Sequence, residues 1–266
     1  MSRGYITLTT DFGNGDFEAG VLKGVIWNIA PEAKIADLSH DIPPQNILEA
    51  AFLLGRSTPY FPTGSIHVVV VDPGVGTSRR PIAAQLGPQW FVGPDNGVFT
   101  MMLEHAEAKQ LPIGIGHLDR RQYWLSEVSD VFHGRDIFSP AAAHLATGVP
   151  LAEIGTPISD PVRLKVPKPE HHHGIWHAQV VHIDIFGNIG TNLKRDHLAQ
   201  LGDITVHIAD TQIHGLVETF GDRPVGELVA LIDSENDLAI CVVNGNAAQK
   251  LNVKPGDWVE VSGILE

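Results

Sequence analysis

The feature that most constrains the fold is a run of four consecutive valines, Val68 to Val71, in the segment SIHVVVVDPGVG. An uninterrupted apolar run of this length is typical of a strand that is buried on both faces of a sheet. Such a sheet needs a covering layer on each side, and in α/β proteins those layers are helices. The run therefore predicts an α/β domain with a largely parallel sheet.

Strand and helix patterns alternate through the first half of the chain, which supports this prediction. YITLTTDFG predicts a strand that ends at Asp11, and PIAAQL and WFVGPDNG predict strands around a turn. We expect a helix from Asp16 as N-cap to Pro31 as stop, and another in SPAAAHLATG with Ser139 as N-cap. The buried face of the first helix is expected to consist of Phe17, Val21, Val25 and Ile29.

The pattern changes after the Pro-rich segment KVPKPE. Segments such as QVVHIDI, ITVHIAD and WVEVSG alternate apolar and polar residues, which is typical of half-buried strands, and helical patterns are few. The fold expected is an α/β N-terminal domain, Rossmann-like with a mostly parallel sheet, plus a C-terminal all-β barrel domain. We place the N-terminal domain at 1–163, a linker at 164–173 and the C-terminal domain at 174–266.

Composition excludes several functional classes. The 266 residues carry a formal net charge of −13, which argues against nucleic acid as a partner. No apolar stretch is long enough to cross a bilayer and no signal-peptide core is evident, so we expect a cytoplasmic protein without a membrane partner. The single cysteine, Cys241, lies in an apolar run and is expected in the core. The cluster His171, His172, His173 and His177 follows the segment KVPKPE and lacks the convergent spacing of a zinc site.

Polar residues gather where the predicted strands end. Asp72 follows the valine run directly, and ligands of open α/β sheets bind beyond the carboxyl ends of the strands. Asp-Pro-Gly is also ordinary turn chemistry, so the residue alone leaves both interpretations open. Motifs for serine nucleophiles, phosphate loops, dinucleotide binding and zinc proteolysis are absent from the sequence. The Asp, Arg and His residues that remain suit the orientation and deprotonation of a water molecule.

Five motifs in order, TTDFG, VVVDPGVG, FHGRD, DIFGNIGTN and VNGNAA, give the chain a resemblance to the S-adenosyl-L-methionine (SAM) hydroxide adenosyltransferases. The resemblance runs from Ile6 to about Val261. It implies hydrolysis of SAM to adenosine and L-methionine by in-line attack of water or hydroxide on the 5′ carbon. It also implies an N-terminal α/β domain, a C-terminal β-barrel, and a homotrimer with active sites at subunit interfaces.

The resemblance also assigns roles to residues. The catalytic set matches Asp72, Arg79 and His133, with Arg79 preferred over Arg80 because of its spacing from the aspartate. SAM is the substrate, and neither a cofactor nor a metal is implied. The substrate-binding residues implied are Asp11 for the ribose, Asp184 for the methionine amine, Ser234 for the methionine carboxylate, Phe186, Asn188, Asn246 and Ala247 for the adenine, and Phe132 in the pocket wall.

Alternative interpretations remain open at this stage. Asp11 could be a helix cap, Asn188 a turn residue and Phe132 a core residue. Glu235 stands where halogenating relatives have an arginine, which weakens the assignment of Ser234. A SAM-dependent chlorinase or fluorinase is disfavoured by Asp72, since a carboxylate repels a halide, and by Gly134, where the fluorinating relatives have serine. A non-catalytic SAM or adenosine sensor and a metal-dependent hydrolase are the other candidates.

Overall fold

The computed structural model describes residues 4–265 and divides into two compact units, Met1–Lys165 and Val166–Glu266. In the described part, no helix combines the length and apolar character needed to cross a membrane. The expected pairing of an α/β unit with an all-β unit is confirmed. The end of the expected linker differs, because Glu170–His172 form strand β8, which pairs with the next strand in an antiparallel hairpin.

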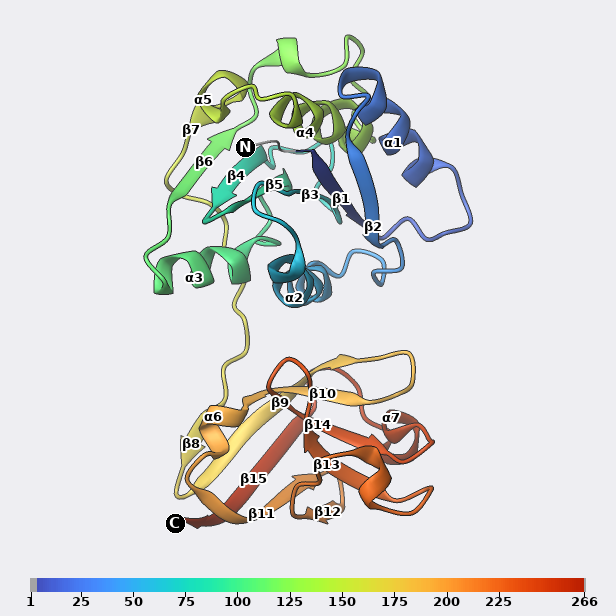
Figure 1. Cartoon of the computed structure of the whole chain (residues 1–266), viewed down its shortest axis with the longest axis vertical. Coiled ribbons are helices and arrows are strands. Elements are labelled where there is room, and N and C mark those ends of the chain that lie inside the picture. Colours follow the sequence, from blue (N-terminus) through green and yellow to red (C-terminus); the bar gives the residue numbers. More distant parts are fainter. Residues whose placement is uncertain (1–3, 266) are drawn as a thin grey trace. The chain divides into compact units, whose positions relative to one another are not determined.

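The N-terminal unit is a seven-stranded sheet between two helical layers (Figure 1). The strand order is β2-β1-β3-β5-β4-β6-β7, in which the neighbouring pairs among β2, β1, β3 and β5 are parallel and the remaining neighbouring pairs are antiparallel. Helices α1 and α4 cover one face, and α2 and α3 cover the other. The strands are β1 Tyr5–Thr10, β2 Lys34–Ser39, β3 Ile66–Val70, β4 Pro81–Leu86, β5 Gln89–Pro94, β6 Ile113–His117 and β7 Thr156–Pro157. The helices are α1 Glu18–Ile29, α2 Ile47–Ser57, η1 Thr58–Tyr60, α3 Thr100–Ala108, η2 Arg121–Tyr123, η3 Gly134–Phe138, α4 Ser139–Ala146 and α5 Leu151–Ile154.

The sheet is mixed because β4 and β5 form a hairpin with only two residues between them. Gly87 occupies this turn at φ +62°, a conformation that side-chain-bearing residues rarely adopt. A two-residue connection can join only antiparallel strands, whereas parallel neighbours need a crossover. The parallel half, β2-β1-β3-β5, is the half whose carboxyl ends carry the polar motifs.

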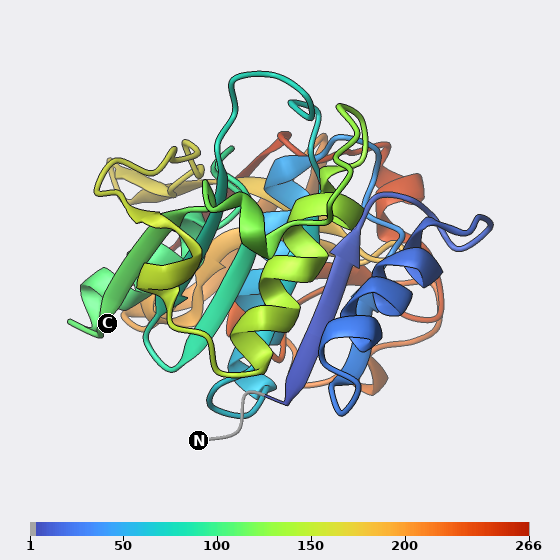
Figure 2. The same ribbon diagram turned by 90° about the horizontal axis from the view of Figure 1, so that it is seen from above.

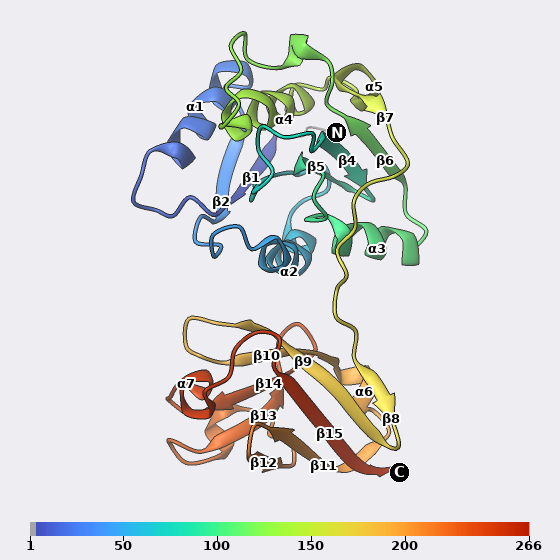
Figure 3. The same cartoon turned by 180° about the vertical axis from the view of Figure 1, so that it is seen from behind.

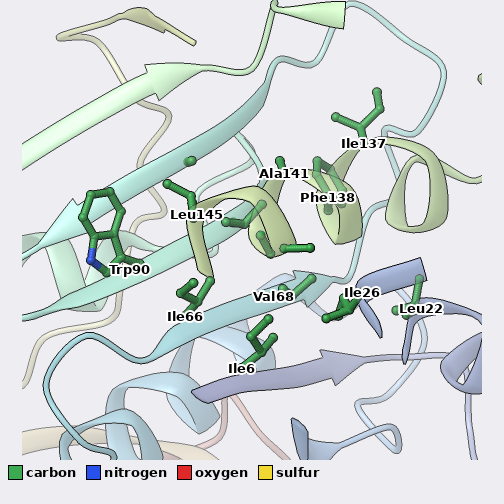
Figure 4. Close-up of a cluster of buried hydrophobic side chains, with 14 of the residues drawn as sticks. Ile6, Leu22, Ile26, Ile66, Val68, Trp90, Ile137, Phe138, Ala141 and Leu145 are labelled. Atoms are coloured by element: carbon green, nitrogen blue, oxygen red, sulfur yellow. The ribbon is translucent and has the colours of Figure 1, made fainter. Parts of the chain in front are cut away.

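The valine run is buried on both faces of the sheet, as its sequence predicts. Val68 and Val70 pack in the cluster under α1 and α4, whereas Val69 and Val71 pack in the cluster under α2 and α3. Figure 4 shows Val68 facing the layer that contains Phe138. Burial on both faces holds β3 rigidly, so the position of the residue that follows it is well fixed.

Two predictions about helix α1 were wrong. The helix buries Leu22 and Ile26, while Phe17 is 65% exposed. The predicted stripe contains residues spaced by four throughout, and such a stripe drifts around a helix of 3.6 residues per turn. Contact with α4 and the sheet then selects the face centred on Leu22 and Ile26. Asp16 is not the N-cap either: its carboxylate accepts the Phe17 N–H at 2.8 Å and the helix begins at Glu18.

The prediction that Ser139 caps α4 was also wrong. The five-residue π-helix η3 leads directly into α4, and Ser139 has helical backbone angles. A cap residue leaves the helix, so a continuous π-to-α segment has no place for one here. Single turns of π-helix are frequently found at functional sites, and this one directly follows His133.

The C-terminal unit is an antiparallel sheet that curls into a near-barrel (Figure 3). Its main strand order is β12-β11-β15-β9-β10-β14-β13, and a bridge between Val217 and Leu231 brings the two ends of this order together. The alternating apolar residues form one core inside it. The strands are β8 Glu170–His172, β9 Ile175–Ile183, β10 Ile189–Lys194, β11 Leu201–Ile208, β12 Thr211–His214, β13 Leu228–Ile232, β14 Asp237–Val242 and β15 Trp258–Leu265. The helices are α6 Arg195–Leu198, η4 Phe220–Asp222 and α7 Ala247–Leu251.

Candidate functional site

Asp11 and Asp72 leave the sheet at the same edge. Strands β1 and β3 are parallel neighbours, and their register pairs Thr10 with Val70. Each aspartate therefore stands just past the carboxyl end of its strand, where ligands of α/β sheets bind. Figure 2 shows the segments that follow β3 and that precede η3 extending at this end of the sheet. The prediction that Asp72 stands just past the end of a buried strand is confirmed.

Asp72, Arg79 and His133 converge although 54 residues separate the last two. Arg79 makes a bidentate contact with the carboxylate: Nε donates to Oδ1 at 3.0 Å, and Nη2 donates to Oδ2. The same Nη2 lies 2.9 Å from His133 Nδ1. The side chains of Arg79 and Asp72 are only 7% and 5% exposed, so solvent screens this pair little.

The electrostatics make the Asp72 carboxylate a stronger base and favour the neutral form of the His133 imidazole. Burial raises the pKa of Asp72, and the charge and hydrogen bonds of Arg79 oppose this without cancelling it. Burial and the positive charge of Arg79 lower the pKa of His133. Because guanidinium groups only donate, His133 Nδ1 must accept from Arg79, which places the ring proton on Nε2. The cluster therefore combines a strengthened base, a fixed cation and an imidazole N–H donor.

The structure separates Arg79 from its neighbour Arg80. Arg80 donates to Asp95 at 2.8 Å and to the carboxylate of Asp160 at 2.9 Å, so its guanidinium is committed to a different pair of acids. In contrast, Arg79 Nη1 is buried and has no hydrogen-bond partner among the described protein atoms. Buried donors without a protein partner are uncommon, and an ordered water molecule is one partner that such a group takes.

A cavity of about 260 Å³ opens at this edge. Asp72 and His133 line it, whereas Arg79 stands behind them and is not in its wall. The other lining residues are Asp11, Phe12, Gln45, Val70, Pro73, Val75, Val131, Phe132 and Gly134. Three of the polar residues that the sequence singled out, Asp11, Asp72 and His133, thus face one cavity.

Phe132 belongs to the cavity wall rather than to the core alone. Its ring packs edge-on against Phe12 at 5.8 Å, and the Arg135 guanidinium lies over it at 5.1 Å. Asp11 is not a helix cap: its Oδ2 accepts the Gln45 N–H at 2.8 Å. This bond leaves the second carboxylate oxygen of Asp11 available to a ligand in the cavity.

Two loops are held together above Asp72. Gly76 has φ +74°, and a Cβ at this position would lie 2.3 Å from the Asp130 carbonyl oxygen. Only glycine permits this approach of the 72–80 loop to the segment before His133. The buried Asp136 holds that segment in turn, because its carboxylate accepts the Ser129 N–H at 2.8 Å.

In the C-terminal unit, five of the predicted binding residues come together around one tight turn. Asp184 Oδ1 accepts the N–H groups of Phe186 and Asn188, and Asp184 Oδ2 accepts the Asn188 side-chain amide at 2.8 Å. Gly187, at φ +82°, has no room for a Cβ because Asn246 lies against it. Asn246 also caps α7, and the following Ala247 is buried.

This turn exposes its apolar side chains to solvent. Ile185 is 93% exposed and Phe186 is 72% exposed, which is unusual for such large apolar groups. The Phe186 ring is therefore available to stack on a planar ligand. The Asp184 carboxylate already serves as the acceptor for its own turn, so any role in amine recognition would be added to a structural one.

Ser234 is not part of this group. It lies in the β13–β14 turn, at the opposite end of β14 from Asn246. Its hydroxyl is 3.3 Å from Glu235 Oε1, an acceptor that would repel a carboxylate ligand.

Sequence reasoning missed Gln45, which lines the cavity and holds Asp11. The residue has φ +64°, and no local pattern marks a glutamine for this conformation. The two prolines before it and Asn46 after it were the available signal, since they predict a tight turn ahead of a helix. Among residues 4–265, no three His, Cys, Asp or Glu side chains stand in an arrangement that could hold a metal ion.

Comparison with known proteins connects both units to one family. Residues 6–155 match the model of the SAM hydroxide adenosyltransferase N-terminal domain, and residues 178–260 match that of the C-terminal domain. A curated (R)-S-adenosyl-L-methionine hydrolase from Salinispora tropica is 37% identical, with 97% of each chain covered. One from Thermus thermophilus is 36% identical, covering 93% of this chain and 95% of the relative.

More distant relatives and a solved structure complete the comparison. A fluorinase from an Actinoplanes species is 28% identical over 97% of both chains. The crystal structure of an uncharacterized conserved protein from Thermotoga maritima is similar with a TM-score of 0.88 and 36% identity. That alignment covers 97% of this chain and 99% of the Thermotoga protein.

Proposed function

The chain belongs to the SAM hydroxide adenosyltransferase family, and we propose that Asp72, Arg79 and His133 carry out its reaction, the hydrolysis of SAM to adenosine and L-methionine. The curated relatives at 34–37% identity are named as hydrolases of this compound, whereas the fluorinases are more distant. The observation that carries the assignment of residues is the double contact of Arg79, which joins Asp72 and His133 at the wall of one cavity.

The chemistry requires little beyond the alignment and activation of one water molecule. A water oxygen attacks the 5′ carbon of SAM as the carbon–sulfur bond breaks, and methionine leaves as a neutral thioether. No general acid is needed, because the sulfonium loses its positive charge on departure. The water proton passes to a base, so the products are adenosine, methionine and one proton.

The geometry supports a division of labour among the three residues. Asp72 accepts the water proton, since burial strengthens it as a base and its oxygens retain lone pairs beyond those that face Arg79. His133 holds its proton on Nε2 and donates to the water oxygen. Arg79 fixes both groups and favours hydroxide character through its positive charge. Asp11 then binds the ribose hydroxyls at the same cavity.

A halogenating activity is the alternative that the structure argues against. The Asp72 carboxylate lines the cavity where a halide would have to bind. A Cβ on Gly134 would lie 2.8 Å from Val70 Cγ1, so the side chain that the fluorinating relatives carry at this position does not fit here without movement. Both features favour water as the nucleophile.

Incubation with SAM in ¹⁸O-labelled water tests the reaction. We expect adenosine that carries the label at its 5′ oxygen, with turnover unaffected by a chelator and no halogenated nucleoside when chloride or fluoride is added. Unlabelled adenosine, or a halogenated product, would contradict the proposal. Asp160→Asn is a matched control for Asp72→Asn, because Asp160 pairs with the neighbouring arginine outside the cavity.

We propose the (R) configuration at sulfur for the substrate, because four curated relatives are named (R)-S-adenosyl-L-methionine hydrolases. The test is a mixture of the two sulfonium epimers, followed by chromatography. Selective loss of the (R) epimer is expected, and selective loss of the (S) epimer would contradict this assignment.

We also propose a homotrimer in which the Asp184 turn of a neighbouring copy completes the site. The exposed Ile185 and Phe186 support this proposal, since large apolar side chains on a surface commonly mark interfaces. Light scattering measures the oligomeric state. Mixing Asp72→Asn with Asn188→Ala subunits, each nearly inactive alone, should restore about a quarter of the sites if they are shared between copies. No recovery after verified subunit exchange would refute shared sites.

A further inference from the structure

A buried histidine beneath Asp11 connects two strands and a helix. His40 lies just after β2 and is 5% exposed. Its Nδ1 is 2.9 Å from Thr10 Oγ1 at the end of β1, and its Nε2 is 3.1 Å from Asp37 Oδ1. Lys23 of α1 donates to the other oxygen of Asp37 at 2.6 Å. These contacts form a chain of polar groups that reaches the last residue before Asp11.

The same histidine holds the Asp11 turn from both sides. Its backbone carbonyl accepts the Gly13 N–H at 2.7 Å, two residues after Asp11. On the other side, Thr10 Oγ1 accepts the Phe12 N–H at 3.3 Å while it contacts the imidazole. The two backbone N–H groups that follow Asp11 are therefore both hydrogen-bonded: that of Gly13 to His40 and that of Phe12 to Thr10.

The charges and hydrogen bonds around His40 favour one arrangement, although Nε2 lies 3.1 Å from Asp37 Oδ1 without the geometry of a hydrogen bond. Burial pushes the pKa of Asp37 upward, but hydrogen bonds and charge from Lys23 and His40 outweigh it and lower the pKa overall. The charged carboxylate beside Nε2 favours the ring proton there, so Nδ1 accepts from the Thr10 hydroxyl. The Thr10 oxygen then keeps a lone pair for the Phe12 N–H, which fixes a single arrangement.

We propose that His40 is a positioning residue for nucleoside recognition, because it fixes the Thr10–Gly13 turn so that Asp11 presents its carboxylate to the ribose hydroxyls. This inference rests on the proposed role of Asp11 in ribose binding. His40 and Thr10 do not line the cavity and act through the turn, whereas Asp11 and Phe12 face the cavity directly. Loss of the His40–Thr10 contact should therefore loosen the ribose end of the site while the reacting groups stay in place.

The fold contains a matched control for this pair. Thr7 of β1 and His67 of β3 are a second buried threonine–histidine pair, with Thr7 Oγ1 2.8 Å from His67 Nδ1. Both residues are fully buried, and neither lines the cavity. Thr7→Val and Thr10→Val thus remove the same group from the same strand, and both variants keep the size of the side chain.

The test compares adenosine affinity by calorimetry and steady-state kinetics with SAM. For Thr10→Val and His40→Ala we expect about tenfold weaker adenosine binding and a similar rise in KM, with kcat changed less than about threefold. For Thr7→Val we expect a loss of stability in urea similar to that of Thr10→Val, with adenosine affinity within about twofold of the original. Unchanged affinity in Thr10→Val, or equal weakening in Thr7→Val, would overturn the proposal.

Hydrogen exchange separates this inference from the proposed function. In protein without ligand, the Phe12 and Gly13 amides should exchange faster in His40→Ala and Thr10→Val, and at the original rate in Thr7→Val. If the unmodified protein binds no adenosine, the role of Asp11 fails whatever the exchange rates are. If the protein binds adenosine but both amides keep their protection in the variants, the inference about His40 fails alone.

Discussion

Asp72→Asn is the substitution that tests the site most directly. Asparagine keeps the shape of the side chain and one acceptor oxygen, but it replaces the other oxygen with an N–H₂ group. One of the two bonds from Arg79 is then lost, because two donors face each other. The variant also loses the lone pairs and the charge that make Asp72 a base.

The expected effects on rate and on stability differ in size. Loss of a positioned general base typically costs about 10²- to 10⁴-fold in rate. Stability should change by less than about 2 kcal/mol, since loss of one charge-assisted bond is offset by the removal of a buried charge. The raised pKa of Asp72 indicates this offset: folding favours the neutral form of this group over the ionised form.

The sign of the linkage gives a further check. For an acid whose pKa is raised by folding, ionisation costs stability, and this cost disappears as pH falls from above the raised pKa to below the ordinary value of 3.8. The stability of the unmodified protein relative to Asp72→Asn should therefore rise as pH falls through this window. A relative stability that falls over the same range would show that the ion pair, rather than burial, dominates at Asp72.

The assay pairs initial rates of adenosine release at saturating SAM with urea unfolding followed by circular dichroism. Asp160→Asn should keep a rate within about twofold, because its exposed pair with Arg80 lies outside the cavity. A rate for Asp72→Asn above one tenth of the original would refute the role as base. A loss of stability above about 4 kcal/mol would show instead that Asp72 is structural.

Three other substitutions probe the remaining parts of the cavity. His133→Ala should lower kcat about 100-fold or more, and it should change the acid limb of the pH–rate profile, because the pKa of His133 is lowered and only Asp72 would still titrate there; an unchanged profile would contradict its role. Asp11→Ala should weaken adenosine binding by about tenfold or more, measured by calorimetry, whereas equal affinity would show that Asp11 only holds Gln45. Gly134→Ser should destabilise the protein by about 1–3 kcal/mol, because the new side chain would press against Val70. Adding Val70→Ala should restore stability in the double variant. A melting temperature that Gly134→Ser alone leaves unchanged would contradict the packing argument.

The sequence predicted the edge of the sheet at which we propose the site. An apolar run that ends in an aspartate can be recognised without any tertiary information, because burial on both faces and the direction of the strand are local consequences of the pattern. The change from helical to alternating periodicity likewise separated the α/β unit from the all-β unit. The order of the motifs was sufficient to recognise the family.

Tertiary structure decided which residues face the cavity and which stand behind it. Arg79 and Arg80 are adjacent and chemically identical, and only the placement of Asp95 and Asp160 sends Arg80 away from Asp72. Tertiary structure also decided the buried face of α1, which was set by contact with α4 rather than by the spacing of its apolar residues.

No local pattern predicts the π-helix that follows His133, and the turn signals around Gln45 do not predict its left-handed backbone. Local patterns determine which segments are buried and where strands end, because those properties depend on a few neighbouring residues. The direction of a long polar side chain depends on partners far away in the sequence. Only the folded sheet, which brings residues 11, 72, 79 and 133 to one edge, could decide it.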